Sequence, residues 1–309
     1  MTDPLPSWND GPAKQAIVTF VRETTSEGSP KFVEPEERIA TFDQDGTMWV
    51  EQPAYTQILF AFHQVSVMAD NDPKLKDVEP FKTVLSGDGA AIGKLPLPEL
   101  LKIVAATHSG TTVEVFQQAV HDWLATAQHP RFKRVYTELV YQPMLEVMQY
   151  VRANGYKTFI VTGGGQDFVR TYSERVYGIP RDQVVGSAGG IAFSYDKSGK
   201  AVLTKDPKLL WIDDKTAKPV DIHLMIGRRP VMAFGNADGD QAMLEYAEGG
   251  DGARFMMLVH HDDATREYAY GPESAMSPFS AALMARAKQG DWVVVSMKND
   301  WKCIFARQS

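Results

Sequence analysis

The segment 38–47 constrains this chain most, because it reads as a buried strand that ends in two carboxylates. Apolar residues at positions 39, 40 and 42 predict the strand, and Asp43 and Asp45 follow it one residue apart, before a Gly-Thr pair. Burying an unpaired carboxylate is costly, so packing does not explain the two aspartates. In open α/β sheets, ligands bind at the carboxyl ends of the strands. Two aspartates at such an end can divide nucleophilic attack and proton transfer between them.

The rest of the chain divides into a helical stretch and an alternating stretch. Residues 53–135 read mostly as helix, and from about residue 142 helices alternate with short strands. This alternation predicts a parallel sheet in an α/β domain, with the helical stretch inserted after the first strand. The periodicity predicts helices at 13–24, 55–69, 112–127 and 143–153. It predicts strands at 39–42, 157–161, 183–187, 191–194, 202–204, 209–212, 231–234, 255–259 and 292–296.

Two later strands also end in polar turns that are rich in glycine. The strand 157–161 runs into Thr-Gly-Gly at 162–164, where a hydroxyl and bare backbone N–H groups suit an anion. The strand 231–234 runs into Gly-Asn-Ala-Asp-Gly-Asp at 235–240, an acidic turn that is rich in glycine. Carboxyl ends of parallel strands meet at one edge of a sheet, so we expect these turns to lie beside the first aspartates.

These turns resemble the motifs of one enzyme superfamily. Asp-Gln-Asp-Gly-Thr at 43–47 is similar to the first motif, Asp-x-Asp-x-Thr, of the haloacid dehalogenase superfamily of phosphohydrolases. The turns at 162–164 and 235–240 resemble its second and fourth motifs, in the same order along the chain. The resemblance implies an α/β fold with a Rossmann-like parallel sheet core, formed by residues 1–52 and 136–309. Residues 53–135 would form a helical cap like those of phosphoserine-phosphatase-like members.

The third motif of the superfamily requires a lysine at the start of a helix. Four lysines lie between positions 205 and 218. Lys218 precedes Pro219, and proline is favoured at the first position of a helix. We therefore favour Lys218 as the motif lysine, with Lys215 as the alternative.

The resemblance implies a Mg²⁺-dependent phosphatase that hydrolyses a small phosphorylated metabolite. Asp43 would attack phosphorus and form an aspartyl-phosphate, and Asp45 would act as general acid and base. Lys218 would offset phosphoryl charge, and Thr162, Gly163 and Gly164 would bind the phosphoryl oxygens. A phosphotransferase or phosphomutase on the same fold is an alternative, as is a non-catalytic protein that binds a phosphate ligand.

The implied metal site departs from the superfamily pattern at one position. Asp43, Asp45 through its backbone carbonyl, Asn236 and Asp240 would hold Mg²⁺, with Asp238 as an alternative ligand. Asn236 stands where the fourth motif has an aspartate, and its amide oxygen can bind Mg²⁺ but brings no charge. With one carboxylate fewer than usual, we expect weak metal affinity.

Glu51 is a candidate for substrate recognition. It lies eight residues after Asp43, where the chain leaves the first strand. Phosphoserine phosphatases carry a substrate-binding glutamate at a similar distance. A carboxylate accepts hydrogen bonds only, so Glu51 would favour a cationic or hydroxylated substrate. The alternative is a solvated glutamate at a hinge.

Composition excludes several other classes. The net charge of −7 disfavours a general nucleic-acid-binding protein. No apolar run has the length of a membrane span. The single cysteine, Cys303, excludes an internal disulfide and a cysteine-based zinc site. The first residues lack a signal pattern, which predicts a cytoplasmic protein, although a periplasmic protein that has lost its leader would look the same. The oligomeric state is not readable from the sequence.

Overall fold

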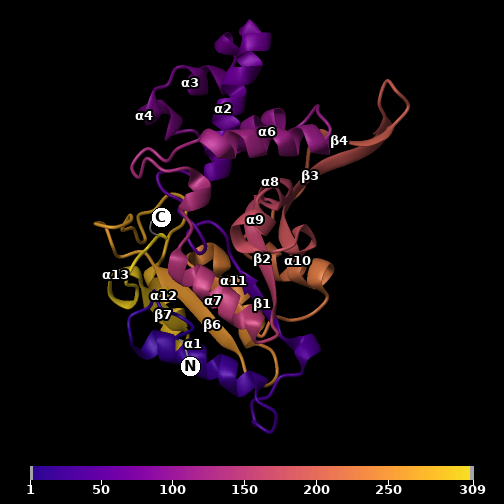
Figure 1. The fold of residues 1–309 in the computed structure, drawn as a ribbon. Coiled ribbons are helices and arrows are strands. Elements are labelled where there is room, and N and C mark those ends of the chain that lie inside the picture. Colours follow the sequence, from indigo (N-terminus) through magenta and orange to yellow (C-terminus); the bar gives the residue numbers. More distant parts are fainter. Residues whose placement is uncertain (1–2, 307–309) are drawn as a thin grey trace.

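The sheet that the sequence predicts is present and has seven strands. The computed structural model describes residues 3–306, and the strands lie in the order β4-β3-β2-β1-β5-β6-β7 (Figure 1). All neighbours are parallel except β3 and β4. This arrangement confirms the predicted α/β fold class with a Rossmann-like core. The strands are β1 (Ile39–Phe42), β2 (Lys157–Gly165), β3 (Val184–Tyr195), β4 (Ala201–Trp211), β5 (Met232–Gly235), β6 (Phe255–His260) and β7 (Val293–Ser296).

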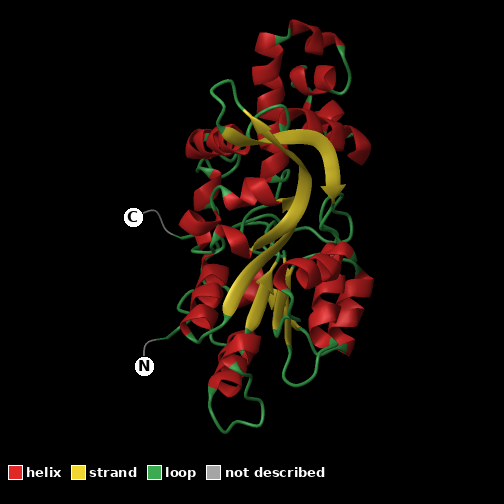
Figure 2. Cartoon of the chain, turned by 90° about the vertical axis from the view of Figure 1, so that its right-hand side faces the viewer, coloured by secondary structure: helices red, strands yellow, loops and turns green. Residues whose placement is uncertain are grey.

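The hairpin formed by β3 and β4 corrects the strand prediction. The sequence suggested four short strands at 183–187, 191–194, 202–204 and 209–212, but the structure joins them into two long antiparallel strands. The register between them shifts at Gly189 and Gly190, and these glycines interrupt the apolar pattern that marked the strands. The hairpin leaves the sheet and curves away from it (Figure 2).

Helices cover both faces of the sheet and form two hydrophobic cores. The first core joins α1 (Pro12–Thr25) and α7 (Gln142–Ala153) to side chains such as Phe42 and Phe234. The second core joins α10 (Ala217–Ile226), α11 (Gln241–Glu248) and α12 (Ala281–Gln289) to the opposite face, which includes Ala233. Phe234 and Ala233 belong to different cores because successive strand residues point to opposite faces.

The remaining helices lie mostly beyond the carboxyl edge of the sheet (Figures 1 and 2). We call α2 to α6 the upper helices, and they enclose a small core of Ala61, Val65, Val84 and Ile103. Their bounds are α2 (Thr56–Asn71), α3 (Phe81–Leu85), α4 (Gly89–Ile92), α5 (Leu97–Thr107) and α6 (Val113–Thr126). The other helices are α8 (Gln166–Arg170), α9 (Ser173–Tyr177) and α13 (Met297–Asp300). Short 3-10 helices span Pro35–Glu37, Pro73–Asp77, Tyr136–Glu138, Arg181–Gln183 and Asp238–Asp240.

Local sequence explains where these helices begin and which side they bury. The Thr112 hydroxyl accepts from the backbone N–H of Val115 and caps α6. Phe116, Val120 and Leu124 follow at intervals of four residues and are buried. The helices predicted from periodicity agree with α1, α2, α6 and α7 to within two residues at each end. Within residues 3–306, no helix combines the length and the apolar character that crossing a bilayer requires.

The predicted cap boundaries, at 52/53 and 135/136, stay a prediction. Residues 1, 2 and 307–309 of the predicted core lie outside the described residues.

Lys205 of β4 connects the hairpin to the upper helices. Its backbone carbonyl accepts from Gly110 at 2.9 Å, and its N–H donates to the Thr111 carbonyl at 2.8 Å. Its buried ammonium group forms an ion pair with Asp167 of α8. The same group lies 4.6 Å from the centroid of the Phe116 ring. Lys205 therefore connects the hairpin to the helix after β2 and to the upper helices.

The first prediction tests the centre of the sheet. Phe42 is fully buried and stacks on Phe234 with ring centroids 4.3 Å apart. We expect Phe42→Ala to lower the free energy of unfolding by about 3–5 kcal/mol, through lost burial and a residual cavity. Phe193→Ala is the control, because Phe193 is 64% exposed on the hairpin and should change stability by less than about 0.5 kcal/mol. Urea unfolding measures both, and equal losses would contradict the assignment of the core.

Candidate active site

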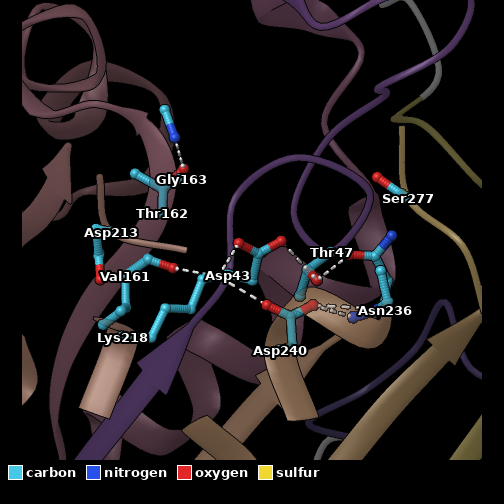
Figure 3. Close-up of polar contacts among 12 residues, drawn as sticks. Asp43, Thr47, Val161, Thr162, Gly163, Asp213, Lys218, Asn236, Asp240 and Ser277 are labelled. Carbon is cyan, nitrogen blue, oxygen red and sulfur yellow. Dashed lines mark hydrogen bonds and ion pairs between the residues drawn. The ribbon is translucent and has the colours of Figure 1, made fainter. Parts of the chain in front are cut away.

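The side chains of the candidate site come from the carboxyl ends of three adjacent strands and from one helix. Asp43 follows β1, Thr162 lies near the end of β2, and Asn236 and Asp240 follow β5. Since β1 lies between β2 and β5 in the sheet, these three ends meet. Helix α10 adds Lys218 from the side of β2 (Figure 3).

Lys218 lies at the centre of this group. It is buried, and its ammonium group donates to three oxygen atoms from three elements. The acceptors are Asp43 Oδ1 at 2.6 Å, Asp240 Oδ1 at 2.7 Å and the Val161 carbonyl at 3.0 Å (Figure 3). Lys215 is exposed at the start of the same segment and has a left-handed backbone with φ of 54°. The structure therefore brings Lys218, and not Lys215, to the aspartates.

The charges of this group do not balance. Burial opposes the charged form of Lys218, but Asp240 and Asp43 outweigh this effect and raise its pKa. Burial and the Asp240 carboxylate raise the pKa of Asp43, against the pull of Lys218. One ammonium group faces two buried carboxylates, so the site has room for a further positive charge.

The side chain of Asp45 contacts Trp49 and the second turn. The indole Nε1 of Trp49 donates to Asp45 Oδ1 at 2.7 Å. The other oxygen, Oδ2, faces Gly164, because a methyl group placed on Gly164 would lie 3.8 Å from it. Burial raises the pKa of Asp45 to about 6, although the Trp49 hydrogen bond opposes this shift. The side chain can therefore exchange a proton with a group bound beside the second turn.

The turn after β2 lies near Asp45 and contains the Thr162 hydroxyl group. The Thr162 hydroxyl accepts from the backbone N–H of Gly164 at 3.0 Å. Gly163 is exposed, and its carbonyl accepts from the Ser187 hydroxyl at 2.7 Å. A side chain at Gly164 would crowd Thr162 Oγ1, which would lie 3.2 Å from its Cβ. The turn thus keeps its backbone open to an anion.

The oxygens that could hold a metal ion converge at Thr47. The Thr47 hydroxyl donates to Asp43 Oδ2 at 3.3 Å and to Asn236 Oδ1 at 3.1 Å (Figure 3). Both are hard oxygen ligands of the kind that Mg²⁺ prefers, and the excess negative charge of the site fits a cation. No group of three His, Cys, Asp or Glu side chains in residues 3–306 is arranged to hold a metal. One reason is that Asn236, which contacts Thr47 beside Asp43, has an amide in place of a carboxylate.

The acidic residues Asp238 and Asp240 of the turn at 235–240 accept hydrogen bonds from backbone N–H groups. Asp240 Oδ2 accepts from the backbone N–H groups of Asn236 at 2.9 Å and Ala237 at 3.1 Å. Asp238 Oδ1 accepts from the N–H of Ser280, the residue that caps α12. Asp240 therefore holds the turn and Lys218 together, and Asp238 anchors the next helix.

Glu51 is buried, with 1% of its surface exposed. Its carboxylate accepts from Asn236, Tyr270 and Ser277. Burial raises the pKa of Glu51 to about 7, in opposition to these hydrogen bonds and to the nearby His261. The proposed contact between Glu51 and a substrate stays a prediction, and its contacts indicate another role that we develop below.

The sequence as a whole matches one protein family. The match to the family described as haloacid dehalogenase-like hydrolase extends over residues 40–245, which is more than half of the chain and includes the three turns and Lys218. The chain belongs to this hydrolase family.

Two solved structures are similar to this hydrolase in fold. A conserved protein of unknown function from Anaerococcus prevotii superimposes with a TM-score of 0.60 at 13% identity, covering 100% of both chains. A protein of unknown function from Bordetella pertussis gives a TM-score of 0.50 at 14% identity, over 84% of this chain and 98% of the other. These identities support a common fold and nothing finer. A search of curated proteins returned no match.

The structure adds site residues of the hydrolase that sequence reasoning missed. Gln57 of α2 accepts from the backbone N–H of Gly165 at 2.7 Å, and its amide nitrogen lies 3.1 Å from His108 Nε2. Burial lowers the pKa of His108 to about 3, so this imidazole is neutral. Gln57 is a polar residue in an otherwise apolar helix face, but nothing in the sequence indicates that it reaches the second turn.

His261 contacts the backbone of the first motif. Its Nε2 lies 2.7 Å from the Gly46 carbonyl, and its Nδ1 lies 3.2 Å from the Glu267 carboxylate. Burial opposes protonation of His261, but Glu267 outweighs it and raises the pKa. His261 therefore links the Gly46 carbonyl of the first motif to the buried Glu267 carboxylate.

Asp213 is a third buried carboxyl group near Lys218, after Asp43 and Asp240 (Figure 3). Neither of its oxygens has a hydrogen-bond partner in the part of the chain that the structure describes. Burial raises the pKa of Asp213 to about 8, while Lys218 opposes the shift. The side chain is therefore mostly protonated at neutral pH.

The second prediction concerns Lys218. Replacing it by methionine leaves Asp43 and Asp240 buried without their cation, so we expect Lys218→Met to lower the free energy of unfolding of the hydrolase by about 3–5 kcal/mol. Lys215→Met is the matched control, and its exposed side chain should change stability by less than about 0.5 kcal/mol. Urea unfolding without added metal compares the two. A loss below about 1 kcal/mol for Lys218→Met would contradict this central role.

Proposed function

We propose that this hydrolase is a Mg²⁺-dependent phosphatase that acts on a small phosphomonoester through an aspartyl-phosphate intermediate. The observation that carries the proposal is the position of Asp43. It lies within 2.6 Å of Lys218, beside the Thr162 turn and two residues before a second buried aspartate that faces that turn. Nucleophile, cation, anion-binding turn and proton donor are thus gathered around one point, as phosphoryl transfer requires.

The first half of the reaction transfers the phosphoryl group to Asp43. An Asp43 oxygen attacks phosphorus, a new P–O bond forms, and the bond between phosphorus and the leaving oxygen breaks. Asp45 Oδ2 faces the second turn and delivers the proton that the leaving oxygen needs. Lys218 and the Thr162 turn bind phosphoryl oxygens as negative charge shifts among them.

The second half releases phosphate. Asp45, now deprotonated, takes a proton from water, and the resulting hydroxide attacks phosphorus and restores Asp43 as a carboxylate. Asp43, the backbone carbonyl of Asp45, Asn236 and, as the alternative, Asp240 would hold Mg²⁺. When bound, Mg²⁺ neutralises charge on the phosphoryl group.

The third prediction tests the nucleophile. Asp43→Asn should reduce kcat on a chromogenic phosphate ester on the order of 10³-fold or more, because an amide cannot form the intermediate. The variant should still fold, since one of two buried carboxylates is removed. Asp70→Asn, an exposed change in α2, is the control and should retain activity. Activity of Asp43→Asn within tenfold of the parent, with its mass verified, would contradict the covalent mechanism.

The fourth prediction tests the metal and the acceptor together. A chelator should abolish release of both alcohol and inorganic phosphate, and added Mg²⁺ should restore both. Equal amounts of alcohol and phosphate identify water as the acceptor. Alcohol without matching phosphate would instead indicate a phosphotransferase or phosphomutase. Full activity in chelator would exclude the metal requirement, and absence of turnover on a panel of phosphorylated metabolites would favour a binding protein.

A further inference from the structure

Asn236 occupies the fourth-motif position at which the site lacks a carboxylate. Its two side-chain atoms face different partners. Oδ1 accepts from Thr47 at 3.1 Å, on the side of Asp43, and Nδ2 donates to Glu51 Oε1 at 3.2 Å. Asn236 therefore lies between the proposed metal ligands and a buried glutamate.

The chemistry of Glu51 fixes the orientation of this amide. Glu51 Oε1 accepts from Asn236 Nδ2, and two hydroxyl groups donate to the same carboxyl group, so the NH₂ group of Asn236 faces Glu51. The carbonyl oxygen of Asn236 then faces Thr47 and Asp43. Without an acceptor at Glu51, the amide could turn and present NH₂ to the metal site, where it cannot act as a ligand.

Glu51 is itself held in one position. Its Oε2 accepts from the Ser277 hydroxyl at 2.5 Å, and its Oε1 also accepts from the Tyr270 hydroxyl. Figure 3 shows Asn236 between Thr47 and Ser277, with its amide nitrogen directed away from Thr47. Both carboxylate oxygens are thus engaged by donors of the protein, which argues against a contact with a substrate.

The first motif closes over the pair of Asn236 and Glu51. Gly46 has a left-handed backbone with φ of 78°, and it passes so close that a Cβ atom would lie 2.1 Å from Asn236 Nδ2 and 2.7 Å from Glu51 Cδ. A side chain at position 46 would displace both. The loop that contains Asp43 and Asp45 is therefore packed directly on this pair.

We infer that Glu51 is a positioning residue for the metal site, which orients the Asn236 amide so that its carbonyl oxygen faces Thr47 and Asp43. The inference rests on the Mg²⁺ dependence of the proposed function. A buried carboxylate that accepts from the amide NH₂ polarises the amide and makes its carbonyl oxygen a better ligand. The residue that orients the Asn236 amide thus lies 185 residues earlier in the chain.

The experiment measures Mg²⁺ binding directly, by isothermal titration calorimetry on the full chain. Glu51→Gln should weaken Mg²⁺ binding roughly 10–100-fold, the range typical of residues that support metal ligands. Its amide can donate as well as accept, so it no longer fixes Asn236. Glu146→Gln is the matched control, because Glu146 is a buried glutamate that accepts from Ser7 and Gln142, and it should leave binding unchanged.

A double-mutant cycle separates positioning from a general structural effect. Asn236→Asp alone places a second carboxylate against Glu51, whereas the double variant Glu51→Gln/Asn236→Asp exchanges amide and carboxylate and keeps a donor between them. Asn236→Asp should therefore improve Mg²⁺ affinity at least tenfold more in the Glu51→Gln background than in the parent. Purely structural damage by Glu51→Gln would make the two changes additive.

Additive effects, unchanged binding in Glu51→Gln, or no Mg²⁺ binding by the parent at 10 mM would each overturn the inference. If Glu51→Gln does not fold, Glu51→Asp retains the charge but draws it back from Asn236, and it should weaken Mg²⁺ binding at least fivefold. Turnover of phosphate esters without the coupling would leave the phosphatase proposal intact and reject the role of Glu51. Coupling in a protein that hydrolyses no phosphate ester would support the role of Glu51 and reject the phosphatase proposal.

Discussion

The buried contact of Lys218 with Asp43 and Asp240 is the interaction on which the rest of the site depends. Three elements that are far apart in the sequence meet there, and each would carry an uncompensated charge without the others. Its cost is desolvation of three ionic groups, which the hydrogen bonds only partly offset. Well-packed apolar side chains could replace the whole group with little loss of stability, so its chemistry explains the arrangement better than folding does.

Short-range patterns were sufficient to predict the sheet and the ends of its strands. Apolar runs that break into Asp, Thr-Gly or Asn turns identify carboxyl ends, because buried strands tolerate such residues only there. The α/β fold and the hydrolase family follow from them. The antiparallel hairpin was missed because Gly189 and Gly190 divide its apolar pattern into pieces that look like separate strands.

Long-range contacts explain what the sequence could not show. Glu51 reaches Ser277 and Tyr270, which are 226 and 219 residues later in the chain, and no local periodicity records such a pairing. The substitution at Asn236 looked like a simple loss of charge when it was considered with its neighbours in sequence. In the fold its amide donates to Glu51, a contact that its neighbours in sequence do not reveal.

The attachment at Lys205 limits how the upper helices can move. A group of helices joined to a core only where its chain enters and leaves can rotate as a lid about those two points. Here the upper helices also contact the core through Phe60 and Gln57, and β4 adds a further attachment, through two backbone hydrogen bonds to residues 110–111 and an ion pair to Asp167 beside the second turn. Opening must therefore either break this attachment or carry the whole hairpin along. Access to the turn at 162–164 is then coupled to a movement of the sheet's own edge.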